Sequence, residues 1–311
     1  MDRKIYLRGM VGQCWYNFTE GLAYALLYRP IPKELIYEKK VPYGKEKKQY
    51  INILHRKDLE GKKKPVFIYI HGGGWISGIT EMRNTYISNW AKEGFFTASI
   101  SYTVAPQKQY PDSVQEIYNA IDFLFDNREK YNLDTDNIVI AGESAGGYYI
   151  MYLASAIADK SLLKRAGLTF RHSDEFSVKA MITHCGCYNL ESLLDDSKKQ
   201  SKFPDMKMMA TSFLGRSKQE AIKWLKTEEG RLASPKVSEK FPPTFVTWCT
   251  RDWLRYEAFD LMKELKRYGV PYGEFKGDGI IGNHAWTIVT IFSKGKECFI
   301  KSKDFVMKYI D

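Results

Sequence analysis

The sequence lacks any long apolar run, and it has few cysteines. No stretch reaches the ~18 uninterrupted apolar residues that a membrane-spanning helix needs, so no span is expected. The first 30 residues mix apolar and charged side chains and lack the apolar core and small-residue cleavage site of a signal peptide. Five cysteines, an odd number in 311 residues, do not form a disulfide framework. We therefore expect a cytoplasmic protein.

Signals for a metal site are also missing. Cys185 and Cys187 stand beside His184, but no second pair of ligands follows at the spacing of a zinc site. We predict structural cysteines and no metal or cofactor.

The charge is strongly basic, with 47 Lys and Arg against 37 Asp and Glu and a net charge of +10. Residues 39–64 alone hold ten basic and three acidic residues. This block covers an expected edge hairpin, where lysines deter pairing with other sheets. Nothing in the block resembles a groove-reading motif, so we predict no nucleic-acid partner.

Short β-branched runs alternate with helical patterns over most of the chain, which indicates βαβ units and a parallel sheet with helices on both faces. The expected strands are 66–70, 95–100, 138–141, 178–183, 244–248 and 272–276, after a hairpin of 34–40 and 49–56.

Two segments interrupt the alternation, 1–33 and 188–240, and both are rich in aromatic residues or methionine. They divide the chain into an N-terminal cap segment (1–33), a first core part (34–187), a cap insertion (188–240) and a second core part (241–311). Whether these segments are ordinary helical core or a cap that contacts substrate stays open.

The motif Gly142-Glu143-Ser144-Ala145-Gly146 follows a predicted strand and precedes a helical stretch. This context is typical of a nucleophile elbow, in which a sharp strand-to-helix turn exposes the Ser144 hydroxyl. A second glycine motif, His71-Gly72-Gly73-Gly74-Trp75, follows the strand at 66–70. The amides of Gly73, Gly74 and Ala145 are the candidate donors of an oxyanion hole.

A serine nucleophile needs a base and an orienting carboxylate. In folds built on a nucleophile elbow, these follow the serine in the order acid, then histidine. His284 lies in a loop beyond the last predicted strand, whereas His172 and His184 precede any candidate acid. Asp252 follows the strand at 244–248 and is the first candidate acid; Asp278 is the alternative.

With these motifs, residues 34–311 resemble the hormone-sensitive-lipase-type α/β-hydrolases. The resemblance implies an α/β-hydrolase fold, with a mostly parallel eight-stranded sheet and a helical cap, and a serine carboxylesterase acting on short- to medium-chain acyl or aryl esters. Glu143 stands where the family often has Asp.

The substrate pocket is less defined by the sequence. We expect walls from 1–33, from 184–188 and from 188–240, with Trp75, Tyr188 and Trp286 as candidate pocket residues. The partner is a small-molecule ester, and a homodimer is compatible with the sequence. The alternatives are an arylformamidase-like amide hydrolase, which also has an HGG-x-W loop, and a non-catalytic ligand-binding homologue.

Overall fold

The computed structural model describes residues 2–27, 29–197 and 205–310. An eight-stranded sheet forms its centre, with strand order β1-β2-β4-β3-β5-β6-β7-β8. β2 pairs antiparallel with β1 and β4, and all other neighbours are parallel. The strands are β1 (Leu35–Pro42), β2 (Tyr50–Arg56), β3 (Lys64–Ile70), β4 (Phe96–Ile100), β5 (Leu133–Glu143), β6 (Ala180–His184), β7 (Thr244–Cys249) and β8 (Tyr272–Gly277). The predicted sheet is confirmed.

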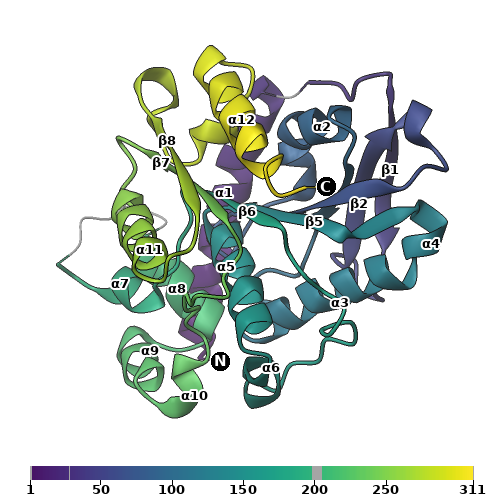
Figure 1. Cartoon of the computed structure of the whole chain (residues 1–311). Coiled ribbons are helices and arrows are strands. Elements are labelled where there is room, and N and C mark those ends of the chain that lie inside the picture. Colours follow the sequence, from purple (N-terminus) through teal and green to yellow (C-terminus); the bar gives the residue numbers. More distant parts are fainter. Residues whose placement is uncertain (1, 28, 198–204, 311) are drawn as a thin grey trace.

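Helices cover both faces of the sheet (Figure 1). On one face lie α2 (Asn84–Lys92) and α12 (Ser293–Val306), and on the other lie α3 (Asp112–Asp126), α5 (Ala145–Ala158) and α11 (Arg255–Arg267). Two short helices complete the core, α4 (Arg128–Tyr131) and α6 (Ser161–Arg165). No helix in the described ranges is long and apolar enough to cross a membrane.

The central strand β3 explains the layered arrangement. Val66, Ile68 and Ile70 pack into one apolar cluster, whereas Phe67 and Tyr69 pack into the other. Because successive side chains of a strand point to opposite faces, a strand that is apolar at every position needs helices on both sides.

The basic block occupies the predicted edge hairpin, since β1 is the first strand of the sheet. β4 lies between β2 and β3, but β2 still runs antiparallel to β3. The turn between β2 and β3 therefore lies at the amino end of β3, away from the end of β5 where Ser144 follows. Lys64 is an exception within the block: it is buried and donates to the carbonyls of Leu59 and Lys62.

The segments that interrupt the alternation are helical. The N-terminal segment forms α1 (Arg3–Leu27), which packs against α8. The later segment contains α7 (Leu190–Leu194), α8 (Met206–Leu214), α9 (Lys218–Leu225) and α10 (Glu228–Arg231). Its residues 198–204 lie outside the described part of the chain. Gly12 brings α1 close to α8, because a Cβ there would lie 2.3 Å from the Met208 Cε.

Candidate active site

Ser144 lies on a tight turn between β5 and α5. Its backbone has φ 54° and ψ −120°, in a region that side chains rarely occupy. The turn is held because the Ser144 amide donates to the His184 carbonyl at 3.0 Å and the Gly147 amide donates to the Ser144 carbonyl at 2.9 Å. Glycine is required at Gly146, where a Cβ would lie 2.1 Å from the Ile70 carbonyl oxygen.

Asp252 and His284 are in direct contact. His284 Nδ1 lies 2.8 Å from Asp252 Oδ2, although 32 residues separate them in the sequence. Asp252 follows β7 and is fully buried, and its other oxygen accepts from the Leu254 amide at 2.9 Å. The Trp253 indole stacks on the His284 ring with centroids 5.3 Å apart. The ring is thus fixed by both a hydrogen bond and a stacking contact.

This contact shifts the titration of both groups. Burial alone would raise the pKa of the Asp252 carboxyl, but the His284 ring outweighs burial and holds that pKa below its usual range. Burial alone would lower the pKa of His284, but Asp252 outweighs it and raises that pKa above 6.5. The alternative acid, Asp278, instead pairs with Lys294.

Two other histidines, His71 and His184, are buried in the protein. Burial lowers the pKa of His71 to about 4 and that of His184 to about 3, so both are neutral near pH 7. His71 Nδ1 contacts the Gly72 carbonyl at 2.8 Å, and the ring stacks on Tyr102. His71 therefore supports the glycine loop.

The glycine loop lies against the turn that carries Ser144: a Cβ at Gly72 would lie 3.0 Å from the Ser144 Cβ. Gly73 has φ 109° and its carbonyl accepts from the Ile76 and Ser77 amides at 3.2 and 3.0 Å. Among the described residues, neither the Gly73 nor the Gly74 amide donates to another protein group. Fixed, unpaired amides beside a serine hydroxyl are the groups that an oxyanion hole uses.

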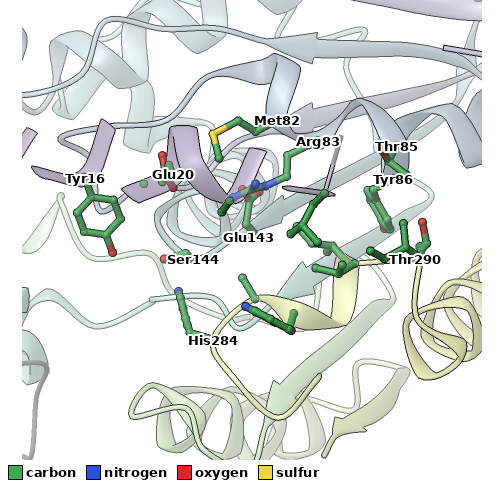
Figure 2. A pocket seen from close by; sticks show the side chains of 18 residues that line it. Tyr16, Glu20, Met82, Arg83, Thr85, Tyr86, Glu143, Ser144, His284 and Thr290 are labelled. Atoms are coloured by element: carbon green, nitrogen blue, oxygen red, sulfur yellow. The ribbon is translucent and has the colours of Figure 1, made fainter. Parts of the chain in front are cut away.

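A cavity of about 200 Å³ opens beside Ser144 (Figure 2). Its wall combines α1, the 3₁₀ turn Thr80–Arg83 with the start of α2, and the loop around His284, and Gly73 also lines it. The lining residues are Tyr16, Glu20, Ala23, Leu27, Gly73, Met82, Arg83, Thr85, Tyr86, Glu143, Ser144, His284, Ala285, Trp286, Ile288, Val289, Thr290 and Ile291.

An ion pair forms part of the cavity wall. The Glu143 side chain is 1% exposed and accepts from Arg83 Nε at 2.7 Å, and the Tyr69 hydroxyl donates to its other oxygen. Burial alone would lower the pKa of Arg83, but the Glu143 carboxylate outweighs it and raises that pKa. Glu143, directly before Ser144, thus holds a cation in the cavity wall.

Two residues of α1 add polar groups to the cavity. Figure 2 shows the Tyr16 hydroxyl pointing toward Ser144. Burial raises the pKa of this phenol to about 12, so it stays a donor. Glu20 receives a hydrogen bond from Ser77 Oγ at 3.2 Å, and burial raises the pKa of its carboxyl. The aromatic residues of 1–33 hinted at this wall, but no motif indicated Glu20 or Arg83.

The three candidate pocket residues have different positions. Trp286 lines the cavity. Trp75 does not line it: the residue has a positive φ, is fully buried, and its indole stacks on Phe213. Tyr188 is buried and its hydroxyl contacts Thr183 Oγ1 at 2.6 Å. None of the described residues from 188–240 lines this cavity. Several of them, such as Leu190, Met208 and Phe213, belong to the apolar core instead.

Cys185 lies against the acid–histidine pair. Its Sγ is 3.4 Å from that of Cys249, and both thiols are free. Potential ligand atoms of Cys185, Asp252 and His284 lie within 4.8 Å of one another. Because the carboxylate and the imidazole already bond to each other, this cluster is explained without a metal ion.

The sequence matches a known protein family over the region that contains most of this site. The family model described as BD-FAE matches residues 52–256, about two thirds of the chain. The chain belongs to the BD-FAE family. The match includes the glycine loop, Ser144 and Asp252. The predicted resemblance to hormone-sensitive-lipase-type α/β-hydrolases is confirmed.

Individual relatives of this BD-FAE family member carry esterase names. Esterase LipC of Mycobacterium tuberculosis is 27% identical over 79% of the chain and 60% of its own length. An esterase of Gibberella moniliformis is 26% identical over 81% of the chain and 76% of its own length. A putative α/β hydrolase of Acanthamoeba polyphaga mimivirus is 33% identical, but the match spans only 31% of the chain and 28% of that protein.

Solved structures agree on the fold. Esterase B of Lactobacillus rhamnosis superposes with a TM-score of 0.81 over 98% of this chain and 95% of its own, at 17% identity. The Pyrobaculum calidifontis esterase gives 0.72 over 100% and 94%, at 20% identity. At these low identities, the similarity shows the fold alone: this BD-FAE family member has the α/β-hydrolase architecture.

Proposed function

We propose that the protein is a serine carboxylesterase, with Ser144 as nucleophile, His284 as base and Asp252 as the acid that orients it. The observation that carries the proposal is the 2.8 Å contact of His284 with Asp252 at a cavity that Ser144 also lines. The esterase names of LipC and the Gibberella protein support it.

The reaction has two steps. His284 Nε2 removes the proton from Ser144 Oγ as that oxygen attacks the ester carbonyl, and the amides of Gly73, Gly74 and Ala145 stabilise the oxyanion. The imidazolium then protonates the leaving alcohol, which leaves an acyl-enzyme. Water, deprotonated by the same imidazole, releases the acid and restores Ser144. Asp252 holds the imidazole tautomer and stabilises the imidazolium.

The cavity supports short- to medium-chain acyl or aryl groups. Its volume of about 200 Å³ is below that of most drug-sized pockets, at roughly 300–1,000 Å³. Leu27, Ile288 and Ile291 supply apolar wall, and Tyr16 and Arg83 supply polar contacts. A cytoplasmic location stays a prediction.

The test is hydrolysis of p-nitrophenyl esters of increasing chain length by wild type and Ser144→Ala. We expect loss of about 10⁶-fold in kcat, to near the uncatalysed rate. A matched anilide series separates esterase from amidase activity. Unchanged turnover in Ser144→Ala, or faster cleavage of anilides than of esters, would refute the proposal.

A further inference from the structure

The outer face of α1 is unusual for a surface helix. Large apolar side chains recur there at intervals of three and four residues, and each is at least half exposed. They are Leu7 (52% exposed), Val11 (60%), Trp15 (51%), Phe18 (70%), Leu22 (60%) and Leu26 (69%). We call these six residues the outer stripe. Their spacing places them along one side of the helix.

The inner face of α1 is already used by the protein. Gly9 and Gly12 are buried, and Tyr16, Glu20, Ala23 and Leu27 line the cavity. Glu20, the only charged residue between positions 9 and 27, therefore faces inward. A helix that is apolar on both sides is normally buried on both sides. Since each of the six side chains is at least half exposed, the outer stripe presents a solvent-facing apolar surface.

Charge decides which partner this surface fits. At the start of the stripe, exposed Arg3, Lys4 and Arg8 outnumber exposed Asp2. After its end, exposed Arg29 and Lys33 outnumber exposed Glu34, so both ends are net basic. A second copy pairing along the stripe would bring basic ends against basic ends, either parallel or antiparallel, and like charges in contact oppose association. An anionic lipid surface complements both basic ends.

We propose that the outer stripe docks onto an anionic lipid bilayer, with α1 lying in the plane of the interface. Leucine, phenylalanine and tryptophan enter the boundary between headgroups and acyl chains, and the flanking basic residues contact the headgroups. This is attachment by one helix face and requires no span. The docking does not depend on the proposed esterase activity. If that function holds, the helix that contacts lipid is also the wall of the substrate cavity.

The experiment is co-sedimentation with vesicles of phosphatidylcholine and phosphatidylserine, and with phosphatidylcholine alone. The protein carries Ser144→Ala, so the result is independent of turnover. The test variant adds Phe18→Glu and Leu22→Glu. The matched control adds the same two charges at Ile300 and Met307, which are each 50% exposed on and after α12. Neither pair lines the cavity.

We expect binding to the anionic vesicles, and weaker binding to phosphatidylcholine alone. High salt should weaken binding to the anionic vesicles, and the α1 variant should lose about a hundredfold in affinity. The control should bind like its parent. When Ser144 is retained, the α1 variant should hydrolyse a dissolved short-chain ester at the wild-type rate, which shows that the variant is folded. If it does not fold, Arg3→Gln, Lys4→Gln and Arg8→Gln together should reduce binding to anionic vesicles alone.

Three outcomes would overturn the proposal. The first is no vesicle binding by the parent, and the second is equal binding by parent and α1 variant. The third is a dimer in lipid-free solution that the α1 variant dissociates and the control does not, which would assign the stripe to a second copy.

Discussion

The two sides of the cavity are built in different ways. Ser144, Asp252 and His284 follow the carboxyl ends of β5, β7 and β8, which a parallel sheet brings to one edge. Tyr16, Glu20 and Arg83 come from α1 and a 3₁₀ turn, which lie far apart in the sequence. The reacting side is thus set by local motifs on a regular scaffold. The wall is set by how distant segments meet, and the following predictions test this division.

The largest effect should come from the reacting side. Asp252→Asn should lower kcat by about 10⁴-fold, because the imidazole loses its orienting partner. The base must be neutral, so wild-type kcat/KM should rise with pH through the raised pKa of His284. Removing the Asp252 charge lowers that pKa, so the acidic limb should move to lower pH. A pH–rate profile measures both changes.

Asp278→Asn is the control for this change, since Asp278 pairs with Lys294 and does not contact His284. It should leave both kcat and the acidic limb within a fewfold of wild type. An equally severe loss in Asp278→Asn would contradict the assignment of Asp252.

The glycine loop should come next. Gly73→Ala places a Cβ 2.2 Å from the Ser77 carbonyl oxygen at φ 109°, so the loop must shift and its amides with it. We expect kcat to fall by about 10²–10³-fold, the size of losing one oxyanion donor. Gly61→Ala controls for backbone strain, because Gly61 also has a positive φ (74°) but no atom near its Cβ position. Equal kcat losses in the two variants would contradict a specific role for the loop.

The wall should respond mainly in stability. Arg83→Met leaves the buried Glu143 carboxylate without its cation, which should cost about 2–3 kcal/mol, given that Arg83 is itself partly exposed. Urea unfolding measures it. Arg165→Met removes a pair with Asp159 that is about half exposed on both sides, and it should cost less than about 1 kcal/mol. Similar losses of unfolding free energy in both variants would mean that the buried ion pair stabilises the protein no more than an exposed one.

These contrasts explain which parts could be predicted. The strands were evident because each is a short apolar run between turn residues, and Ser144 because its motif needs a strand before it and a helix after it. The position of β4 between β2 and β3 was not evident, since no local pattern reports strand order. Trp75 was misleading: its place in the glycine motif indicated the pocket, but the residue is fully buried and its indole stacks on Phe213. No sequence pattern indicated Arg83 as a cavity residue, because its partner Glu143 is 60 residues away in the sequence.

The smallest effect should be on substrate selectivity, through the charge of Glu20 in the cavity wall. Burial raises the pKa of Glu20, so wild type gains a negative charge in the cavity only as pH rises through that raised value. Above it, esters with an anionic group should be disfavoured against neutral esters by several-fold, and the preference should fade as pH falls. Glu20→Gln lacks the charge, so its preference should not change with pH over this range. Glu239→Gln, at an exposed position, should behave like wild type. If Glu20→Gln keeps the pH-dependent preference, the discriminating charge lies on the reacting side, and the division between the two sides fails at this point.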